Sequence, residues 1–279
     1  MQFGVTSFLT DRSIGPVELA RALEERGLDS LYLPEHTHIP TSRASPWPGG
    51  GDLPEEYRRC LDPFVALTAA AAVTKKLRVG TGVCLVAQRD PIVTAKCVAT
   101  LDLVAPGRFV FGVGSGWNRE EAEDHRVDFK QRRARVREHI LIMRRLWTDE
   151  VASFEGQQAR LSPSWAWPKP ASPPPILVGG AASPSLFAQI ADRADGWPPI
   201  GGAGVSAALP ELRAAFERAG RDPASARVVL YGVLPDAGKL DHYRQLGVEE
   251  VVFGAPSGPA DVLLPVLDHY AKMVRGLTT

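Results

Sequence analysis

The segment LPEHTH at residues 33–38 carries the residue types best suited to acid and base chemistry. The imidazole of His36 can transfer a proton near neutral pH or donate a hydrogen bond to an anionic intermediate, and Glu35 places a carboxylate beside it. The alternative is a packed histidine with no chemical role. A metal site on His36 and His38 would need further ligands, but the other histidines lie in helical patterns or in a loop and form no convergent set. We therefore expect a proton-transferring His36 and no bound metal.

Two glycine-containing segments could hold a ligand through their backbone. In ILVGGAASP (176–184), Gly179 and Gly180 allow close approach and a helix begins directly afterwards, which predicts a phosphate site, although the same residues also suit an ordinary helix start. In GVGSGW (112–117), the last position is Trp117, so the segment matches neither the dinucleotide fingerprint nor a nucleophile elbow. We interpret it as a backbone turn beside an indole that could contact a flat ligand or simply pack.

Short apolar segments rich in β-branched residues alternate with segments of helical spacing along the whole chain. Eight such βα units in 279 residues predict an α/β fold, a single (β/α)8 TIM barrel, instead of a six-stranded dinucleotide-binding sheet. A barrel collects the carboxyl ends of its strands at one mouth, so the chemical segments should meet there. The predicted strands are 3–8, 30–33, 77–86, 108–113, 176–178, 195–198, 228–233 and 251–253, and the predicted helices are 15–26, 63–74, 91–104, 128–147, 184–193, 205–219, 239–246 and 260–273.

Three insertions interrupt the alternation. A polar segment rich in glycine and proline follows the second strand at 37–60, and a second excursion follows the fourth strand at 114–127. Both should lie on the active face because they follow strands. The third, 149–175, contains a possible small hairpin and a proline-rich stretch, and it precedes the fifth strand, so it should start from the opposite face.

Composition excludes several classes of protein. The 32 Lys and Arg residues equal the 32 Asp and Glu residues, and like charges do not gather in blocks, which argues against a nucleic-acid binder. The 3 cysteines lack C-x-x-C spacing, which argues against a disulfide framework and favours a cytoplasmic location. No signal peptide and no apolar run of about 18 residues is found, so we expect no membrane anchoring. The expected partner is a small-molecule substrate.

Six segments in order resemble the luciferase-like monooxygenase superfamily, most closely its actinobacterial branch of coenzyme F420-dependent oxidoreductases. The resemblance covers residues 1–255 and implies a TIM barrel with insertions, so we interpret 1–279 as one luciferase-like domain. The segments are LYLPEH (31–36), VGTGV (79–83), PIVTAK (91–96), LDLVAPGRF (101–109), GVGSGWNREE (112–121) and PPILVGG (174–180).

The resemblance implies roles for particular positions. His36 matches a histidine near the reactive carbon of the deazaflavin ring, and Glu35 matches a polar position that hydrogen-bonds the ring or its ribityl hydroxyls. Gly82–Val83 matches a non-prolyl cis peptide that forms a bulge behind the ring. Gly179, Gly180 and Ala181 match backbone that holds the cofactor phosphate or ribityl chain.

One departure from the resembled family affects the expected substrate. Its sugar-phosphate dehydrogenases carry a glutamate where this chain has Trp117, so that acid role is unfilled. We expect hydride transfer between F420 and a small, more apolar organic substrate, with Trp117 and Trp197 shaping the pocket. The alternatives are an FMN-dependent two-component monooxygenase on the same fold, a metal-dependent hydrolase, and a barrel that binds cofactor without catalysis. The resemblance and the tryptophan-rich loops also suggest a homodimer.

Overall fold

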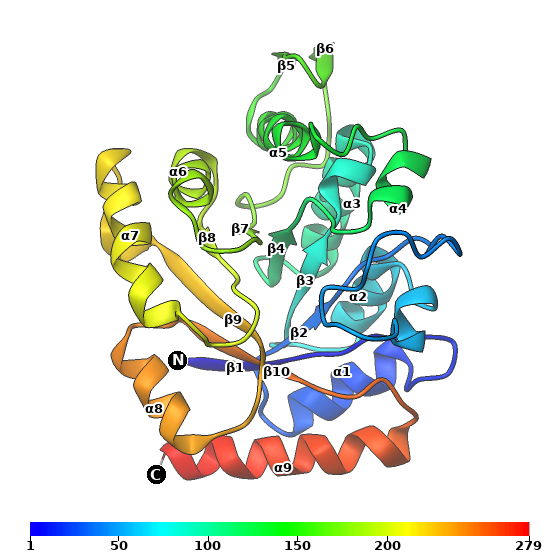
Figure 1. Ribbon diagram of the computed structural model, residues 1–279, viewed down its shortest axis with the longest axis vertical. Helices are drawn as coiled ribbons and strands as arrows, with labels where there is room; N and C mark the ends of the chain where they lie inside the picture. The colour runs from blue at the N-terminus through cyan, green and yellow to red at the C-terminus, as the bar shows by residue number, and fades with distance from the viewer. Residues whose placement is uncertain (279) are drawn as a thin grey trace.

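Eight parallel strands form a closed barrel in the computed structural model, which describes residues 1–278 (Figure 1). This confirms the predicted TIM barrel, and every predicted strand takes part in it. The order around the barrel is β1-β10-β9-β8-β7-β4-β3-β2. The strands are β1 (Gln2–Thr6), β2 (Ser30–Leu33), β3 (Arg78–Cys84), β4 (Phe109–Val113), β7 (Ile176–Val178), β8 (Gly196–Trp197), β9 (Arg227–Val233) and β10 (Glu250–Gly254).

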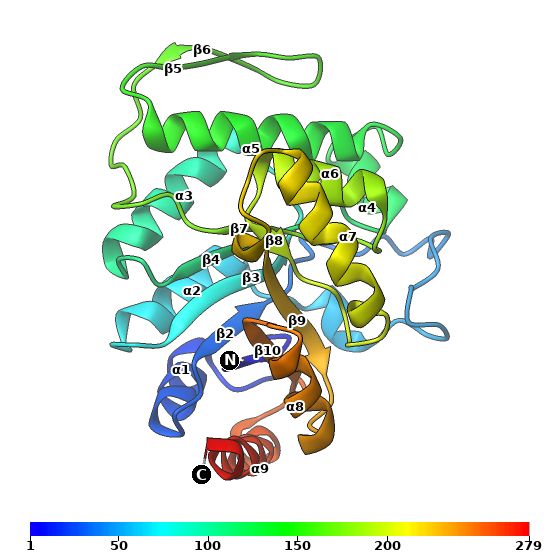
Figure 2. The same cartoon turned by 90° about the vertical axis from the view of Figure 1, so that its left-hand side faces the viewer.

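Helices surround the barrel, as two perpendicular views show (Figures 1 and 2). Proline at the first helical position opens several of them, because it lacks only an N–H that would be unpaired there. Within residues 1–278, no helix is both long and apolar enough to cross a membrane. The surrounding helices are α1 (Pro16–Glu25), α2 (Pro63–Ala72), α3 (Pro91–Val104), α5 (Arg132–Thr148), α6 (Pro184–Arg193), α7 (Val205–Arg218), α8 (Ala237–Gln245) and α9 (Ala260–Thr278).

The insertions add short elements outside the barrel. The first contains a 3₁₀ helix, η1 (Glu55–Arg58), and the second contains a short helix, α4 (Arg119–Asp124), which the sequence pattern did not predict. The third contains the predicted hairpin, formed by the antiparallel strands β5 (Ala152–Glu155) and β6 (Arg160–Ser164). Two further 3₁₀ turns are η2 (Val86–Gln88) and η3 (Pro223–Ser225).

The β5–β6 hairpin lies beyond α5, on the side away from the barrel (Figure 2). The buried carboxylate of Glu138 on α5 holds its turn by accepting hydrogen bonds from the backbone N–H groups of Gln157, Gln158 and Ala159 at 3.1, 2.7 and 2.9 Å. Trp165 and Trp167, which follow the hairpin, are 77% and 62% exposed. They therefore stay candidates for the predicted homodimer contact.

Side chains fill the interior of the barrel and close its base. Tyr32, Tyr231 and four aliphatic residues form a cluster separate from the core between strands and helices. Below them the fully buried carboxylate of Glu250 accepts a hydrogen bond from Tyr32 Oη at 2.9 Å and lies 2.8 Å from Arg78 Nη2. Burial raises the pKa of Glu250. With the base filled, the ligand site must lie at the mouth.

The titration of His139 should be visible in the stability of the protein. Its ring on α5 is buried, and Nδ1 lies 2.9 Å from the carbonyl oxygen of Val86 in η2. Burial lowers the pKa of His139. The unfolded chain therefore binds a proton that the folded chain does not, so the free energy of unfolding should decrease as the pH falls below about 6.5, by at most about 1.4 kcal/mol per pH unit.

Urea unfolding of the wild type and two variants at about pH 5 and about pH 7.5 checks this pH dependence of the stability. His139→Gln should lose less stability than the wild type at the lower pH, whereas His269→Gln, at an exposed position on α9, should behave like the wild type. Equal losses in all three proteins would contradict the assignment.

Candidate functional site

The segments predicted to carry chemistry meet at the mouth of the barrel. They follow β2, β3, β4 and β7, which are consecutive neighbours in the barrel. Parallel pairing brings their carboxyl ends to one edge, so residues far apart in sequence become neighbours. The four segments are 34–38 after β2, Gly82–Val83 at the end of β3, 114–117 after β4, and Gly179–Ala181 after β7.

His36 and Glu121 form a buried pair at this mouth. Nδ1 of His36 lies 2.9 Å from Oε2 of Glu121, and the two residues are 8% and 0% exposed. If the Glu121 carboxylate is ionised it only accepts hydrogen bonds, and Nδ1 of His36 is then the donor. No protein group among residues 1–278 bonds Nε2 of His36, which leaves this nitrogen for a ligand. The pair can therefore hold a proton at Nε2 while Glu121 fixes the ring.

Glu121 supplies a carboxylate beside His36 that the sequence analysis did not predict. The resembled sugar-phosphate dehydrogenases have an acidic glutamate where this chain has Trp117, so the sequence predicted no acid at that position. In the structure, α4 brings a different carboxylate, that of Glu121, to His36. Glu121 lies in the first turn of α4, whose N-cap Asn118 accepts the Glu121 N–H at 3.1 Å. Its Oε1 is buried without a partner within the described part of the chain. Glu121 is part of the segment GVGSGWNREE, which the sequence analysis quoted, but the short helix α4 that orients its side chain was not predicted.

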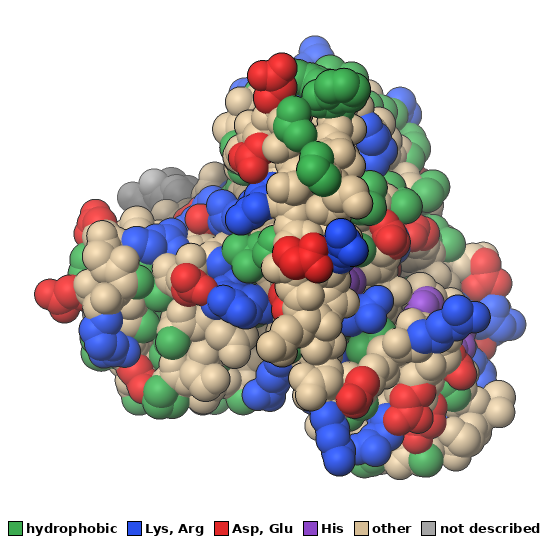
Figure 3. Space-filling view, turned by 90° about the horizontal axis from the view of Figure 1, so that it is seen from above, with side chains coloured by type: hydrophobic (Ala, Val, Ile, Leu, Met, Phe, Trp, Pro, Cys, Tyr) green, Lys and Arg blue, Asp and Glu red, His purple; other side chains and the backbone are tan. Residues whose placement is uncertain are grey.

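Further contacts fasten the loop after β2 to α4. Thr37 Oγ1 lies 2.7 Å from Nε2 of His125, and Nε2 of His38 lies 2.9 Å from Asp124 Oδ2. Lys and Arg side chains are mixed with Asp and Glu side chains over the face seen in Figure 3, and small areas of histidine show among them. His38 thus has a carboxylate partner. Residues 1–278 contain no group of three or more His, Cys, Asp or Glu side chains placed to hold a metal.

Aromatic rings surround His36. The ring centroids of Tyr57 and Trp117 lie 5.3 and 5.8 Å from that of His36, and Trp117 meets it edge-on. Tyr57 also contacts Trp47 and Phe8, with ring centroids 5.9 and 4.5 Å away. Burial raises the pKa of Tyr57, so its hydroxyl stays neutral near pH 7. Trp117 thus lies where a pocket-shaping residue is predicted, and Tyr57 and Trp47, from the first insertion, extend this wall.

Glu35 is held by protein groups on both of its oxygens. The buried carboxylate accepts the backbone N–H of Leu85 on Oε2 at 2.7 Å and Nε of Arg89 on Oε1 at 2.5 Å. Arg89 also pairs with Asp62 at 2.6 Å. Burial lowers the pKa of Arg89, but Glu35, Asp62 and Cys84 together raise it above the ordinary value. Glu35 therefore links the segment after β2 to the segment after β3. A contact between Glu35 and the cofactor stays a prediction.

The Gly82–Val83 peptide bond is cis, as the resemblance implies. A Cβ at Gly114 would lie 2.6 Å from Val83 Cγ2, and a Cβ at Gly179 would lie 3.5 Å from Val83 Cγ1. The side chain of Val83 thus lies between the glycine segments that follow β4 and β7. Glycine at position 114 is needed for this close approach. We call the surface formed by Val83, Gly114 and Gly179 at the mouth the floor of the site.

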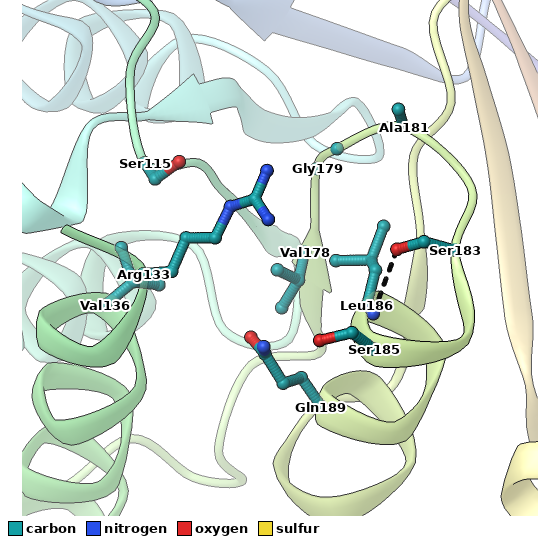
Figure 4. Close-up of a pocket in the computed structure, with 11 residues that line it drawn as sticks. Ser115, Arg133, Val136, Val178, Gly179, Ala181, Ser183, Ser185, Leu186 and Gln189 are labelled. Atoms are coloured by element: carbon teal, nitrogen blue, oxygen red, sulfur yellow. Dashed lines mark hydrogen bonds between the residues drawn. The ribbon is translucent and has the colours of Figure 1, made fainter. Parts of the chain in front are cut away.

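A small pocket of about 70 Å³, open to solvent, lies where α6 begins (Figure 4). Gly179, Gly180 and Ala181 line it, and their binding of an anion stays a prediction. Ser183 caps α6 by accepting the N–H of Leu186 at 3.3 Å. Sequence analysis missed Arg133, which reaches into the pocket from α5. A guanidinium facing a helix start has the chemistry to bind a phosphate. The remaining lining residues are Ser115, Val136, Val178, Ser185, Leu186 and Gln189.

Trp197 supports this loop from beneath. It is 3% exposed, its Nε1 donates to the carbonyl oxygen of Gly180 at 2.9 Å, and its ring contacts Phe187 of α6 edge-on. The indole thus positions the backbone of the pocket. A direct contact between Trp197 and substrate stays a prediction.

The residues of the mouth fit a long, flat ligand that ends in a phosphate. The low floor at Val83 suits a planar ring, the imidazole of His36 can exchange a proton, and the helix start with Arg133 suits the anion. A model of the luciferase-like monooxygenase family matches residues 15–234, which include these segments.

Individual relatives share much of the chain. An uncharacterized protein of Mycobacterium tuberculosis is 43% identical over 266 residues, which cover 94% of this chain and 94% of the relative. The F420-dependent glucose-6-phosphate dehydrogenase of Gordonia bronchialis is 31% identical over 252 residues, covering 86% of this chain and 68% of that protein. A solved F420-dependent secondary alcohol dehydrogenase, in complex with an F420-acetone adduct, superposes with a TM-score of 0.78 at 18% identity, covering 99% of each chain. That last likeness concerns the fold alone.

Proposed function

The chain belongs to the luciferase-like monooxygenase family, and from this premise we propose that it is an oxidoreductase that transfers a hydride between coenzyme F420 and a small organic substrate. The observation that carries the proposal is the His36–Glu121 pair at a mouth whose other segments suit a planar ring and a phosphate. The dehydrogenase of Gordonia bronchialis, named as F420-dependent, supports the choice of cofactor.

Each part of the site has a defined task in this proposal. The floor at Gly82–Val83 backs the ring, and the start of α6 with Arg133 binds the phosphate. When bound, the deazaflavin supplies the hydride chemistry. His36 takes up or releases the substrate proton at Nε2, while Glu121 holds the ring in one tautomer and balances the charge of the imidazolium.

The substrate class follows from the wall around His36. Trp117, Tyr57 and Trp47 present aromatic surface with few charged groups, which suits an apolar or conjugated substrate bearing a carbonyl or hydroxyl group. The rings also keep water from the reacting atoms, which strengthens the hydrogen bond between substrate and His36.

Cofactor titration of the purified protein tests the proposal. We expect F420 to quench tryptophan fluorescence at lower concentrations than FMN. Arg133→Gln should weaken F420 binding about tenfold, because a charge-assisted contact with the phosphate is lost. Arg218→Gln is a matched control, since it removes the same charge from an exposed position in the last turn of α7.

Other outcomes would point to the alternatives. Tighter binding of FMN, with oxygen consumption when reduced FMN is supplied, would assign the protein to the two-component flavin monooxygenases. Binding of neither cofactor would contradict the proposal, and metal analysis of the purified protein would then test the hydrolase alternative. Tight F420 binding without turnover of any carbonyl or alcohol substrate would indicate a carrier.

A further inference from the structure

The short helix α4 depends on its surroundings for its position. It has 6 residues, and isolated helices shorter than about 12 residues are marginal in water. At its start, Ser45 Oγ of the first insertion accepts the backbone N–H of Arg119 at 3.0 Å. Its buried residues are Glu121 and Ala122, both 0% exposed. Because Glu121 is the residue that contacts His36, the position of α4 decides whether this pair forms.

A chain of four polar side chains joins the segment after β2 to the end of α4. Thr37 Oγ1 lies 2.7 Å from Nε2 of His125 and 3.0 Å from Nδ1 of His38. Nε2 of His38 lies 2.9 Å from Oδ2 of Asp124. We call these four residues the Thr37 network.

The hydrogens of the Thr37 network can be placed in only one way when Asp124 is ionised and His38 is neutral. Nε2 of His38 donates to Asp124, so Nδ1 must accept the hydroxyl hydrogen of Thr37. The oxygen of that hydroxyl then accepts the Nε2–H of His125. The single hydroxyl of Thr37 therefore serves both imidazoles, and its loss breaks two hydrogen bonds at once.

The network is placed to orient α4 more than to stabilise the fold. Thr37, His38 and Asp124 are exposed, and exposed polar pairs contribute little to the free energy of unfolding. Thr37 follows His36 directly in the chain, while Asp124 belongs to the same short helix as Glu121. The hydrogen bonds of the network thus join the backbone beside the imidazole to the helix that carries its carboxylate partner.

Resting on the proposed function, we propose that Thr37 is a positioning residue, whose network holds α4 so that Glu121 contacts His36. A displacement of about 1 Å at a reacting group can lower a rate about a hundredfold. Loosening α4 should therefore reduce turnover while leaving cofactor affinity unchanged, because the proposed cofactor contacts lie after β3 and β7.

Histidine NMR of the full-length protein without cofactor tests the position of Glu121. Long-range proton–nitrogen correlations show which ring nitrogen carries a hydrogen, and the His36 signals are those missing from His36→Ala. In the wild type, His36 should be held with its hydrogen on Nδ1. Thr37→Val, which replaces the hydroxyl with a methyl group, should shift the His36 signals toward a mixture of tautomers. Thr37→Ser, which keeps the hydroxyl, should show the wild-type signals.

Turnover and cofactor affinity provide the second readout. Thr37→Val should lower kcat about tenfold, with F420 affinity within about twofold of the wild type, and Thr37→Ser should recover most of kcat. Ser206→Ala is the matched control, because it removes another hydroxyl–imidazole hydrogen bond, 2.9 Å long, between Ser206 on α7 and His242 on α8. It should leave both kcat and the His36 signals unchanged.

The possible outcomes separate this inference from the proposed function. Unchanged His36 signals or an unchanged kcat in Thr37→Val would overturn the inference. An equal shift of the His36 signals in Ser206→Ala would also overturn it, because the effect would then not come from α4. A wild type that turns over no substrate with F420 would overturn the proposed function, whereas the NMR comparison needs no cofactor and still decides whether Thr37 positions Glu121.

Discussion

Replacing His36 with alanine should lower turnover about a thousandfold, within the range of about 10²–10⁴ that positioned acid–base groups contribute. Nδ1 of His36 is committed to Glu121 at 2.9 Å, so Nε2 is the atom through which this residue can act. Cofactor affinity should change little, because the proposed contacts with the phosphate at α6 and with the ring at Gly82–Val83 do not involve His36. Turnover is measured from deazaflavin absorbance with the substrate that the wild type accepts, and affinity from fluorescence quenching.

Variants of Glu121 separate positioning from proton transfer. Glu121→Gln should lower turnover about a hundredfold, since a neutral amide neither balances an imidazolium nor selects the tautomer. Glu121→Asp, which keeps the charge, should recover part of the loss. His242→Ala, at an exposed position on α8, is the matched control for His36→Ala and should remain within about twofold of the wild type. Turnover in His36→Ala comparable to that of this control would show that His36 plays no part in proton transfer.

Replacing Arg89 with alanine should destabilise the protein by about 3–5 kcal/mol. The variant leaves Glu35 as a buried carboxylate, 3% exposed, whose Oε1 has lost its arginine partner. It also removes the pair with Asp62 and the contact between the guanidinium and the ring of Phe64, which lies 4.8 Å away. The change in the free energy of unfolding is measured by urea denaturation at pH 7.

Arg12 offers a comparison for this effect. Arg12→Ala breaks an ion pair with Glu55 of similar geometry, 2.9 Å, but both side chains are largely exposed, at 61% and 46%. Such pairs contribute about 0–1 kcal/mol because water and ions screen them. A double variant, Arg89→Leu with Glu35→Leu, should be more stable than Arg89→Ala because no buried charge is left unpaired. Similar losses for Arg89→Ala and Arg12→Ala would show that burial does not strengthen the Glu35 pair.

The amino-acid sequence alone determined the architecture and the location of the site. Helical and strand periodicities are local properties, so eight βα units could be counted without knowing how they pack. In a parallel barrel, the direction of each strand then decides at which end the following loop lies. This reasoning was sufficient to place His36 and Gly179–Ala181 at one mouth, whereas Gly82–Val83 was assigned to the site through the family resemblance.

Only the tertiary structure decided which side chains meet within that mouth. Glu121 is 85 residues from His36, and their contact depends on the orientation of α4 in an insertion without a clear periodicity. Arg133 lies on a helix whose sequence pattern reports the buried face but not which polar residues border a neighbouring helix. A periodic pattern reflects the burial of each element separately. The pairing of polar groups depends on how two elements pack against each other. A single sequence contains no local signal for this packing.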